Sequence, residues 1–165
     1  MTRPRTGGEK QILTAFLDQQ RDVVLWKLDG LTDDQLREPM TTGGLYLLGL
    51  VKHLAGAEYY WLCEVFGRPA EDLGLAASDH AQLEPGDTTD SVLSCYARAR
   101  AASDQAISEV DLDCTGTTWL GDTVSFRWAI LHVIEETTRH AGHADFIREH
   151  IDGATGYLPP SNLPY

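Results

Sequence analysis

Residues 126–151 read FRWAILHVIEETTRHAGHADFIREHI, and this stretch decides the fold. Its apolar or small positions recur in alternating steps of four and three, which is typical of a helix that buries one face in a bundle. These positions are Phe126, Ile130, Val133, Thr137, His140, Ala144, Ile147 and Ile151. The pattern predicts one long helix whose core-facing stripe contains a histidine where a purely structural helix would carry leucine.

Three more segments show helical spacing and predict helices over residues 9–28, 45–66 and 91–110, the last of them capped by Asp90 or Ser91. A short helical turn is expected at residues 32–36. Long polar connections at 68–87 and 111–123 separate the helices, and TTW at 117–119 is at most a brief extended piece without an evident partner. The sequence therefore predicts an all-α protein, a four-helix bundle with long crossover connections that is not simply up-down-up-down.

Length and composition indicate one globular domain over residues 1–165. Apolar residues make up 42% and charged residues 23%, which excludes a disordered chain. Residues 1–8 form a loose arm in this interpretation. Residues 157–165 form an extended tail, because prolines crowd the end of the chain.

The net charge of −12 disfavours a nucleic-acid partner, since phosphate contacts need a basic face. The three cysteines are far apart and form no CxxC pair, so reduced thiols are expected. There is no apolar signal core and no run of about 20 apolar residues, the length that a membrane-spanning helix needs. We expect a cytoplasmic protein with no membrane partner.

Glu136 and His140 are one helical turn apart, and a carboxylate and an imidazole at this spacing can share a divalent metal ion. His53, beside the apolar stripe of the second helix, is the natural third ligand. Such a set, with a fourth position left to water, is typical of a catalytic zinc site. The alternative is purely structural: a hydrogen bond between Glu136 and His140, and a core histidine at position 53.

A rival ligand set consists of His132, Glu136 and His143, which lie within roughly 40° of one another on the same helix. If His140 is a metal ligand instead, His143 could be a weak ligand, a hydrogen-bond donor to one of the ligands, or a base that faces the substrate. Arg139 could pair with Glu135 or hold a substrate carboxylate.

Two motifs resemble the DinB-like superfamily of metal-binding four-helix proteins. They are LLGLVKHLAGAEYYWL at 47–62 and LHVIEETTRHAGHADFIREHIDGATG at 131–156. The resemblance is closest to the actinobacterial branch that includes mycothiol-dependent maleylpyruvate isomerase. Superfamily members carry a histidine on the second helix and two ligands one turn apart on the last, and the isomerase branch has glutamate at the first of these two. The resemblance implies His53, Glu136 and His140 as the metal ligands.

The resemblance also implies a homodimer and a low-molecular-weight thiol as co-substrate, and it leaves His143 outside the ligand set. The isomerase has an additional C-terminal domain, whereas this chain ends soon after the fourth helix, and this departure counts against the specific maleylpyruvate isomerase activity.

The sequence thus leads to one main hypothesis: a divalent metal-dependent S-transferase or thiol-dependent isomerase that joins a mycothiol-like thiol to a small electrophile. Zinc suits the histidine and carboxylate ligands best, and nickel is the second choice. His143 and Arg139 are the candidate catalytic residues. The alternatives are a metal-dependent hydrolase, with water in place of the thiol, and a non-enzymatic, stress-associated dimer with a structural ion.

Overall fold

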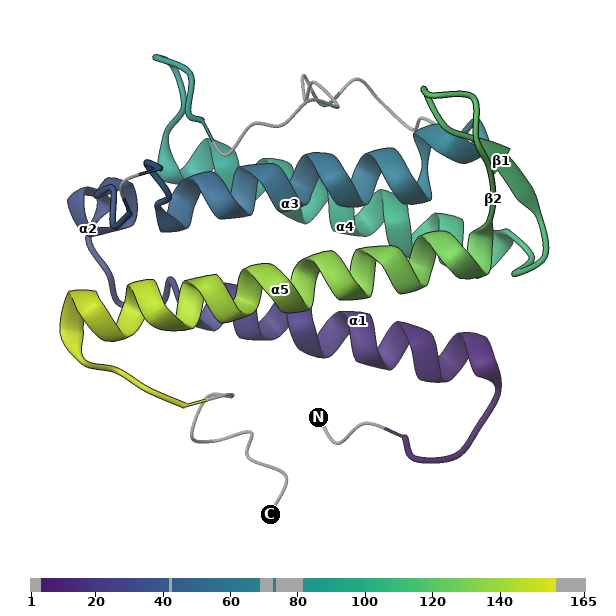
Figure 1. The fold of residues 1–165 in the computed structure, drawn as a ribbon, viewed down its shortest axis with the longest axis horizontal. Helices are drawn as coiled ribbons and strands as arrows, with labels where there is room; N and C mark the ends of the chain where they lie inside the picture. Colours follow the sequence, from purple (N-terminus) through teal and green to yellow (C-terminus); the bar gives the residue numbers. More distant parts are fainter. Residues whose placement is uncertain (1–3, 42, 69–72, 74–81, 157–165) are drawn as a thin grey trace.

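A computed structural model of the protein describes residues 4–41, 43–68, 73 and 82–156 (Figure 1). Within these residues the chain is mainly helical, with one small pair of strands. In chain order the elements are α1 (Glu9–Trp26), α2 (Asp33–Arg37), α3 (Leu47–Leu62), the 3-10 helix η1 (Glu64–Phe66), α4 (Thr89–Glu109), β1 (Thr115–Thr117), β2 (Thr123–Ser125) and α5 (Phe126–Asp152).

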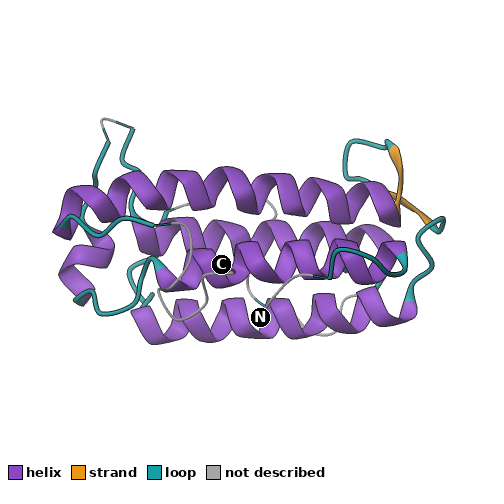
Figure 2. Ribbon diagram, turned by 90° about the horizontal axis from the view of Figure 1, so that it is seen from below, coloured by secondary structure: helices purple, strands orange, loops and turns teal. Residues whose placement is uncertain are grey.

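The four long helices α1, α3, α4 and α5 pack side by side (Figures 1 and 2). Helices α1 and α5 run in the same direction, because Arg127 at the start of α5 pairs with Glu9 at the start of α1, Nε to Oε1 at 2.7 Å. At the other end, Lys27 Nζ just after α1 lies 2.7 Å from Asp145 Oδ1. One ion pair thus ties the two helices together at each end.

Helices α3 and α4 are also parallel to each other. Lys52 in the first half of α3 pairs with Asp87 just before α4, at 2.7 Å, and Arg68 after α3 pairs with Glu109 at the end of α4. A chain that leaves α3 must therefore return along the whole bundle before α4 begins. This explains the long connection between them, and the predicted all-α bundle with a crossover is confirmed.

Helix α5 forms where its sequence signals place it. The Ser125 side chain accepts the backbone N–H of Trp128 at 3.2 Å, which caps the first turn. Gly153 ends the helix in the left-handed conformation, with φ of +76°, which glycine adopts without a Cβ clash. Its buried residues follow the predicted stripe closely; they are Phe126, Ala129, Ile130, Val133, Thr137, Ala141, Ala144 and Ile147.

The ends of two other helices differ from the predictions. Thr88 caps α4 in a capping box with Ser91, so neither Asp90 nor Ser91 is the cap residue. Helix α3 stops at Leu62, and the predicted continuation to residue 66 is a separate 3-10 turn that ends at Gly67. Apolar spacing alone does not distinguish an α-helical last turn from a 3-10 turn.

The TTW segment has a partner, contrary to the prediction. Strand β1 pairs antiparallel with β2, and Thr117 lies opposite Thr123. The hairpin is held closely against η1, because a Cβ on Gly116 would lie 2.3 Å from the backbone oxygen of Val65. Only glycine permits this approach, and a strand of three residues leaves too short an alternation to be recognised in the sequence.

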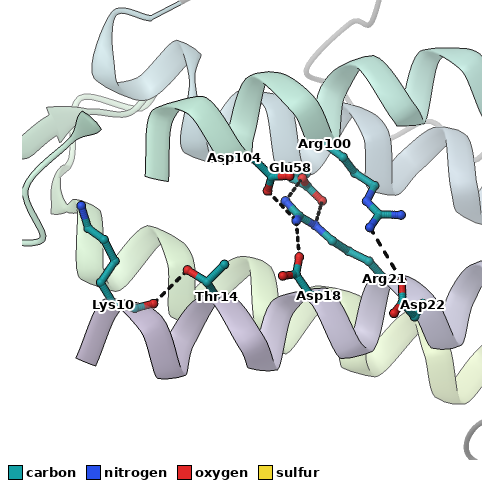
Figure 3. A network of polar contacts seen from close by, with 8 residues as sticks. All are labelled: Lys10, Thr14, Asp18, Arg21, Asp22, Glu58, Arg100 and Asp104. Carbon is teal, nitrogen blue, oxygen red and sulfur yellow. Dashed lines mark hydrogen bonds and ion pairs between the residues drawn. The ribbon is translucent and has the colours of Figure 1, made fainter. Parts of the chain in front are cut away.

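A network of charged side chains joins α1, α3 and α4 (Figure 3). Arg21 is fully buried and donates to both carboxylate oxygens of Glu58, at 2.5 and 3.2 Å. The same guanidinium donates to Asp18 and Asp104, each at 2.7 Å. Burial alone would lower the pKa of Arg21, but the neighbouring carboxylates raise it above its ordinary value, so the side chain stays charged.

Two sequence predictions fall wholly or largely outside the described residues: the tail at 157–165 and most of the crossover at 68–87. Of the predicted N-terminal arm, residues 4–8 are described, and they lie ahead of α1 without helical structure. Among the described helices, none has the length and apolarity needed to cross a membrane.

Candidate metal centre

His53 of α3 meets Glu136 and His140 of α5 where these antiparallel helices pack together. His140 Nε2 lies 3.4 Å from Glu136 Oε2, and His53 Nε2 lies 3.9 Å from the same oxygen. One ligand atom from each residue can be chosen so that all three lie within 4.8 Å of one another. We call this set the triad. Two of its members come from one helix at a spacing of one turn, and the third comes from across the helix interface.

The triad is partly buried, and each of its side chains keeps some surface exposed to solvent. The exposed side-chain fractions are 27% for His53, 28% for Glu136 and 16% for His140. The two imidazole rings meet edge to face, with centroids 4.7 Å apart. His140 takes its place in the buried stripe between Thr137 and Ala144, whose small side chains stand where a core helix would carry larger apolar ones. The triad therefore remains in contact with solvent.

Burial is the largest cause that lowers the pKa of His140, to about 4; the neighbouring His53 acts in the same direction and Glu136 in the opposite one. The ring is therefore neutral at pH 7. A neutral imidazole is the form that ligates a metal ion, because its unprotonated nitrogen carries a free electron pair.

The donor set fits a divalent cation. When His140 ligates through Nε2, two imidazole electron pairs and one carboxylate converge on a small volume. Within the described part of the chain, no lysine or arginine forms an ion pair with Glu136. A half-buried carboxylate without a cation of the chain beside it is electrostatically incomplete, and a divalent cation would neutralise it. Two histidines and a glutamate leave room for an exogenous ligand, as in catalytic zinc sites.

His143 lies beside the triad and touches His140. The Nδ1 atoms of the two rings are 3.4 Å apart. If His140 ligates through Nε2, its Nδ1 carries the proton and donates to His143 Nδ1. The ring of His143 then presents an N–H at Nε2. This arrangement favours a role in orienting His140 over a role as proton acceptor.

Among the described residues, the ligand atoms of the alternative set, His132, Glu136 and His143, do not converge as those of the triad do. His132 stacks on Trp128, with ring centroids 4.9 Å apart and an interplanar angle of 11°. It also meets Trp61 edge to face at 4.6 Å. Arg139 is exposed, and among the described residues it forms no ion pair with Glu135. Its positive charge contributes to lowering the pKa of His140.

Aromatic side chains from α3 and α5 touch one another beside the triad. Trp61 of α3 touches Trp128 of α5 with ring centroids 5.3 Å apart, and Tyr60 touches Trp61 at 5.1 Å. On α5, the spacing indicates that Trp128, His132 and Glu136 share one face, because they follow one another at intervals of four residues. On α3, Tyr60 and Trp61 come seven and eight residues after His53.

Comparison with known proteins gives one family. The family model described as Mycothiol-S-transferase matches residues 12–153, which include all three residues of the triad. No curated protein matches the chain.

Proposed function

Because the chain belongs to the mycothiol-S-transferase family, a member of the DinB-like superfamily, we propose that it is a metal-dependent S-transferase. It would join a low-molecular-weight thiol of the mycothiol kind to a small electrophile. The observation that carries the proposal is the convergence of three ligand atoms from His53, Glu136 and His140 within 4.8 Å. Zinc is the metal that best suits these ligands, with nickel as the alternative.

A divalent ion held by the triad would supply Lewis acidity, which stabilises the anionic form of a thiol or of water. The side chains around the ion would orient its ligands and bind the substrate. His143 fixes the orientation of His140 through the contact between their Nδ1 atoms. Arg139, exposed one turn after Glu135, offers a cation for an anionic group of a substrate.

In the proposed reaction the thiol loses its S–H proton to solvent, with which the partly exposed triad is in contact. The sulfur then forms a bond with an electrophilic carbon, and the leaving group departs with the bonding electron pair. With an activated alkene in place of a leaving group, sulfur adds to one carbon and solvent returns a proton to the other. A thiolate is required because it is the nucleophilic form of the thiol.

The first test is the metal content and thermal melt of the wild type and of the His53→Ala and His140→Ala variants. Near-stoichiometric metal in the wild type, lost in both variants while the fold persists, is the expected result. The matched control is His150→Ala, because His150 is an exposed histidine near the end of α5. A wild type without metal, although never exposed to chelator, would contradict the proposal.

The second test is activity with mycothiol and an electrophile, followed by the release of the thioether product. Activity should depend on the triad and on added metal. Turnover of esters or amides without thiol would point instead to hydrolysis, in which water replaces the thiol. Collapse of the fold on metal removal would point to a structural ion. Full activity in His53→Ala would overturn the proposal.

Two predictions about the whole protein belong with this function. A cytoplasmic location matches a supply of reduced thiols, and a homodimer is the assembly that the sequence resemblance implies. Sedimentation equilibrium of the purified protein tests the second, and a single species at the monomer mass would contradict it.

A further inference from the structure

Four aromatic rings cluster along the interface of α3 and α5, and we call this cluster the aromatic row: Tyr60, Trp61, Trp128 and His132. Trp128 and His132 are stacked, with centroids 4.9 Å apart. The edge of Trp61 meets both of them, at 5.3 Å and 4.6 Å. Tyr60 meets Trp61 at 5.1 Å. Two of the rings come from each of the two helices that carry the triad.

The row leads directly to the triad. His132 is one helical turn before Glu136, which corresponds to about 6 Å along the axis of α5. Tyr60 is seven residues after His53, or about 10 Å along α3, and lies on nearly the same side of that helix. A ring that rests on the row therefore has its substituents within reach of a group held at the triad.

The row is not part of the buried core. Trp128 keeps 45% of its surface exposed, and Tyr60, Trp61 and His132 are only partly buried. The turn of the β1–β2 hairpin lies at the end of the row, because the backbone N–H of Trp119 donates to the Tyr60 hydroxyl at 2.8 Å. Trp119 itself is 75% exposed. Aromatic faces left in water beside a reactive centre are available to a ligand.

We propose that the aromatic row is the binding site for the electrophile, and that it selects flat, conjugated or aromatic electrophiles over aliphatic ones of equal reactivity. This inference rests on the proposed S-transfer function and names its second substrate class. Indole faces are electron-rich, so they stack well with electron-poor rings such as those attached to a carbonyl group. None of the four side chains carries a fixed charge that would favour an ionic electrophile.

The test compares two α-bromo ketones that share one reactive group, phenacyl bromide and bromoacetone. In each, the mycothiol sulfur bonds to the CH₂ carbon, bromide leaves with the electron pair and the thiol proton goes to solvent. For Trp128→Ala we expect about a tenfold loss of kcat/KM with phenacyl bromide, mostly through KM, and a change of less than about twofold with bromoacetone. Trp128→Phe should recover most of the loss, because it keeps an aromatic face.

The matched control is Phe16→Ala, because Phe16 is an aromatic residue of α1 that is 42% exposed, close to the 45% of Trp128. This variant should keep wild-type constants for both ketones. Equal effects of Trp128→Ala on the two ketones would overturn the inference and leave the proposed function intact.

Acetophenone, which has the ring and ketone but no leaving group, separates the two proposals. Its binding to the metal-loaded protein, measured by calorimetry, should weaken about tenfold in Trp128→Ala and stay unchanged in Phe16→Ala. If the wild type catalyses no S-transfer, this result would still support the binding site while the proposed function fails. Unchanged acetophenone binding in Trp128→Ala would overturn the inference whether or not S-transfer occurs.

Discussion

The bundle contains two polar clusters between helices, and they are built in opposite ways. At the Arg21 network, one buried guanidinium faces the carboxylates of Glu58, Asp18 and Asp104 (Figure 3). The cation and its anions are all supplied by the chain. At the triad, a carboxylate and two imidazoles face one another, and the chain supplies no cation among the described residues.

This difference separates a cluster whose charges are paired within the chain from one that is compatible with an added divalent cation. A buried charge is tolerated only when it is paired and hydrogen-bonded, and the Arg21 network meets this condition by itself. The triad has no paired cation among the described residues, and a divalent ion would supply one. Both clusters contain a glutamate, but the side chain of Glu58 is 2% exposed and that of Glu136 is 28% exposed.

The largest effect should come from breaking the closed cluster. Arg21→Met leaves the carboxylate of Glu58 buried without its partner, so we expect the free energy of unfolding to fall by about 3–5 kcal/mol. Urea denaturation monitored by circular dichroism measures this loss. Metal content per folded molecule should not change, because Arg21 does not contact the triad.

The double variant Arg21→Met with Glu58→Leu is the control for this prediction. It replaces the ion pair by apolar side chains of similar size, so it should recover most of the lost stability. Equal destabilisation of the single and double variants would mean that packing, and not the unpaired charge, dominates at this position.

A pH effect of intermediate size is expected at the triad in protein stripped of metal. His140 has a pKa of about 4 in the folded protein, below its ordinary value of 6.5, because it is buried. Between these values the unfolded chain binds a proton that the folded chain does not, so stability falls as the pH is lowered from 6.5 to 4. The difference corresponds to roughly 3 kcal/mol, and denaturation at a series of pH values measures it.

His140→Leu should remove most of this dependence, because leucine does not titrate and fits the apolar stripe of α5. Acid lowers the free energy of unfolding of the metal-free protein through His140, and the His140→Leu substitution should relieve this loss. A metal-free wild type whose stability is flat between pH 6.5 and 4 would contradict the burial of a neutral His140.

The sequence predicted the bundle well because the periodicity of each helix is a local signal. The steps of four and three along α4, from Val92 to Ala106, match the buried residues that the structure shows. Directions and contacts between helices depend on residues far apart in the chain, so the parallel pairing of α3 with α4 did not follow from spacing. The hairpin was missed because each strand has only three residues.

The two polar clusters were not equally visible in the sequence. Glu136 and His140 lie on one helix, so their spacing revealed two members of the triad, and the third was placed by its position beside an apolar stripe and by a motif resemblance to a metal-binding family. Arg21 and Glu58 lie on different helices and 37 residues apart. The neighbours of Arg21 in the sequence do not show that it is buried, because an exposed arginine can also lie at the edge of an apolar stripe.

The smallest effect should come from His143, which touches the triad without joining it. Removing a group that orients a metal-ligating histidine typically costs about 10–100-fold in affinity, and we expect about tenfold for His143→Ala, which corresponds to about 1.4 kcal/mol. The variant loses the contact at Nδ1 of His140, so that ring is free to turn or to change tautomer. Competition with a chromophoric chelator measures the dissociation constant for zinc.

Two further variants decide what this tenfold effect means. His143→Gln should restore part of the affinity, because its amide oxygen can accept the proton of His140 Nδ1. His132→Ala should leave zinc affinity unchanged, since His132 contacts Trp61 and Trp128 although it is one turn from Glu136. A loss of about 1,000-fold or more in His143→Ala, well beyond the cost of losing an orienting group, would instead make His143 a direct ligand. The triad would then be closed by the protein like the Arg21 network, and its ion would be structural.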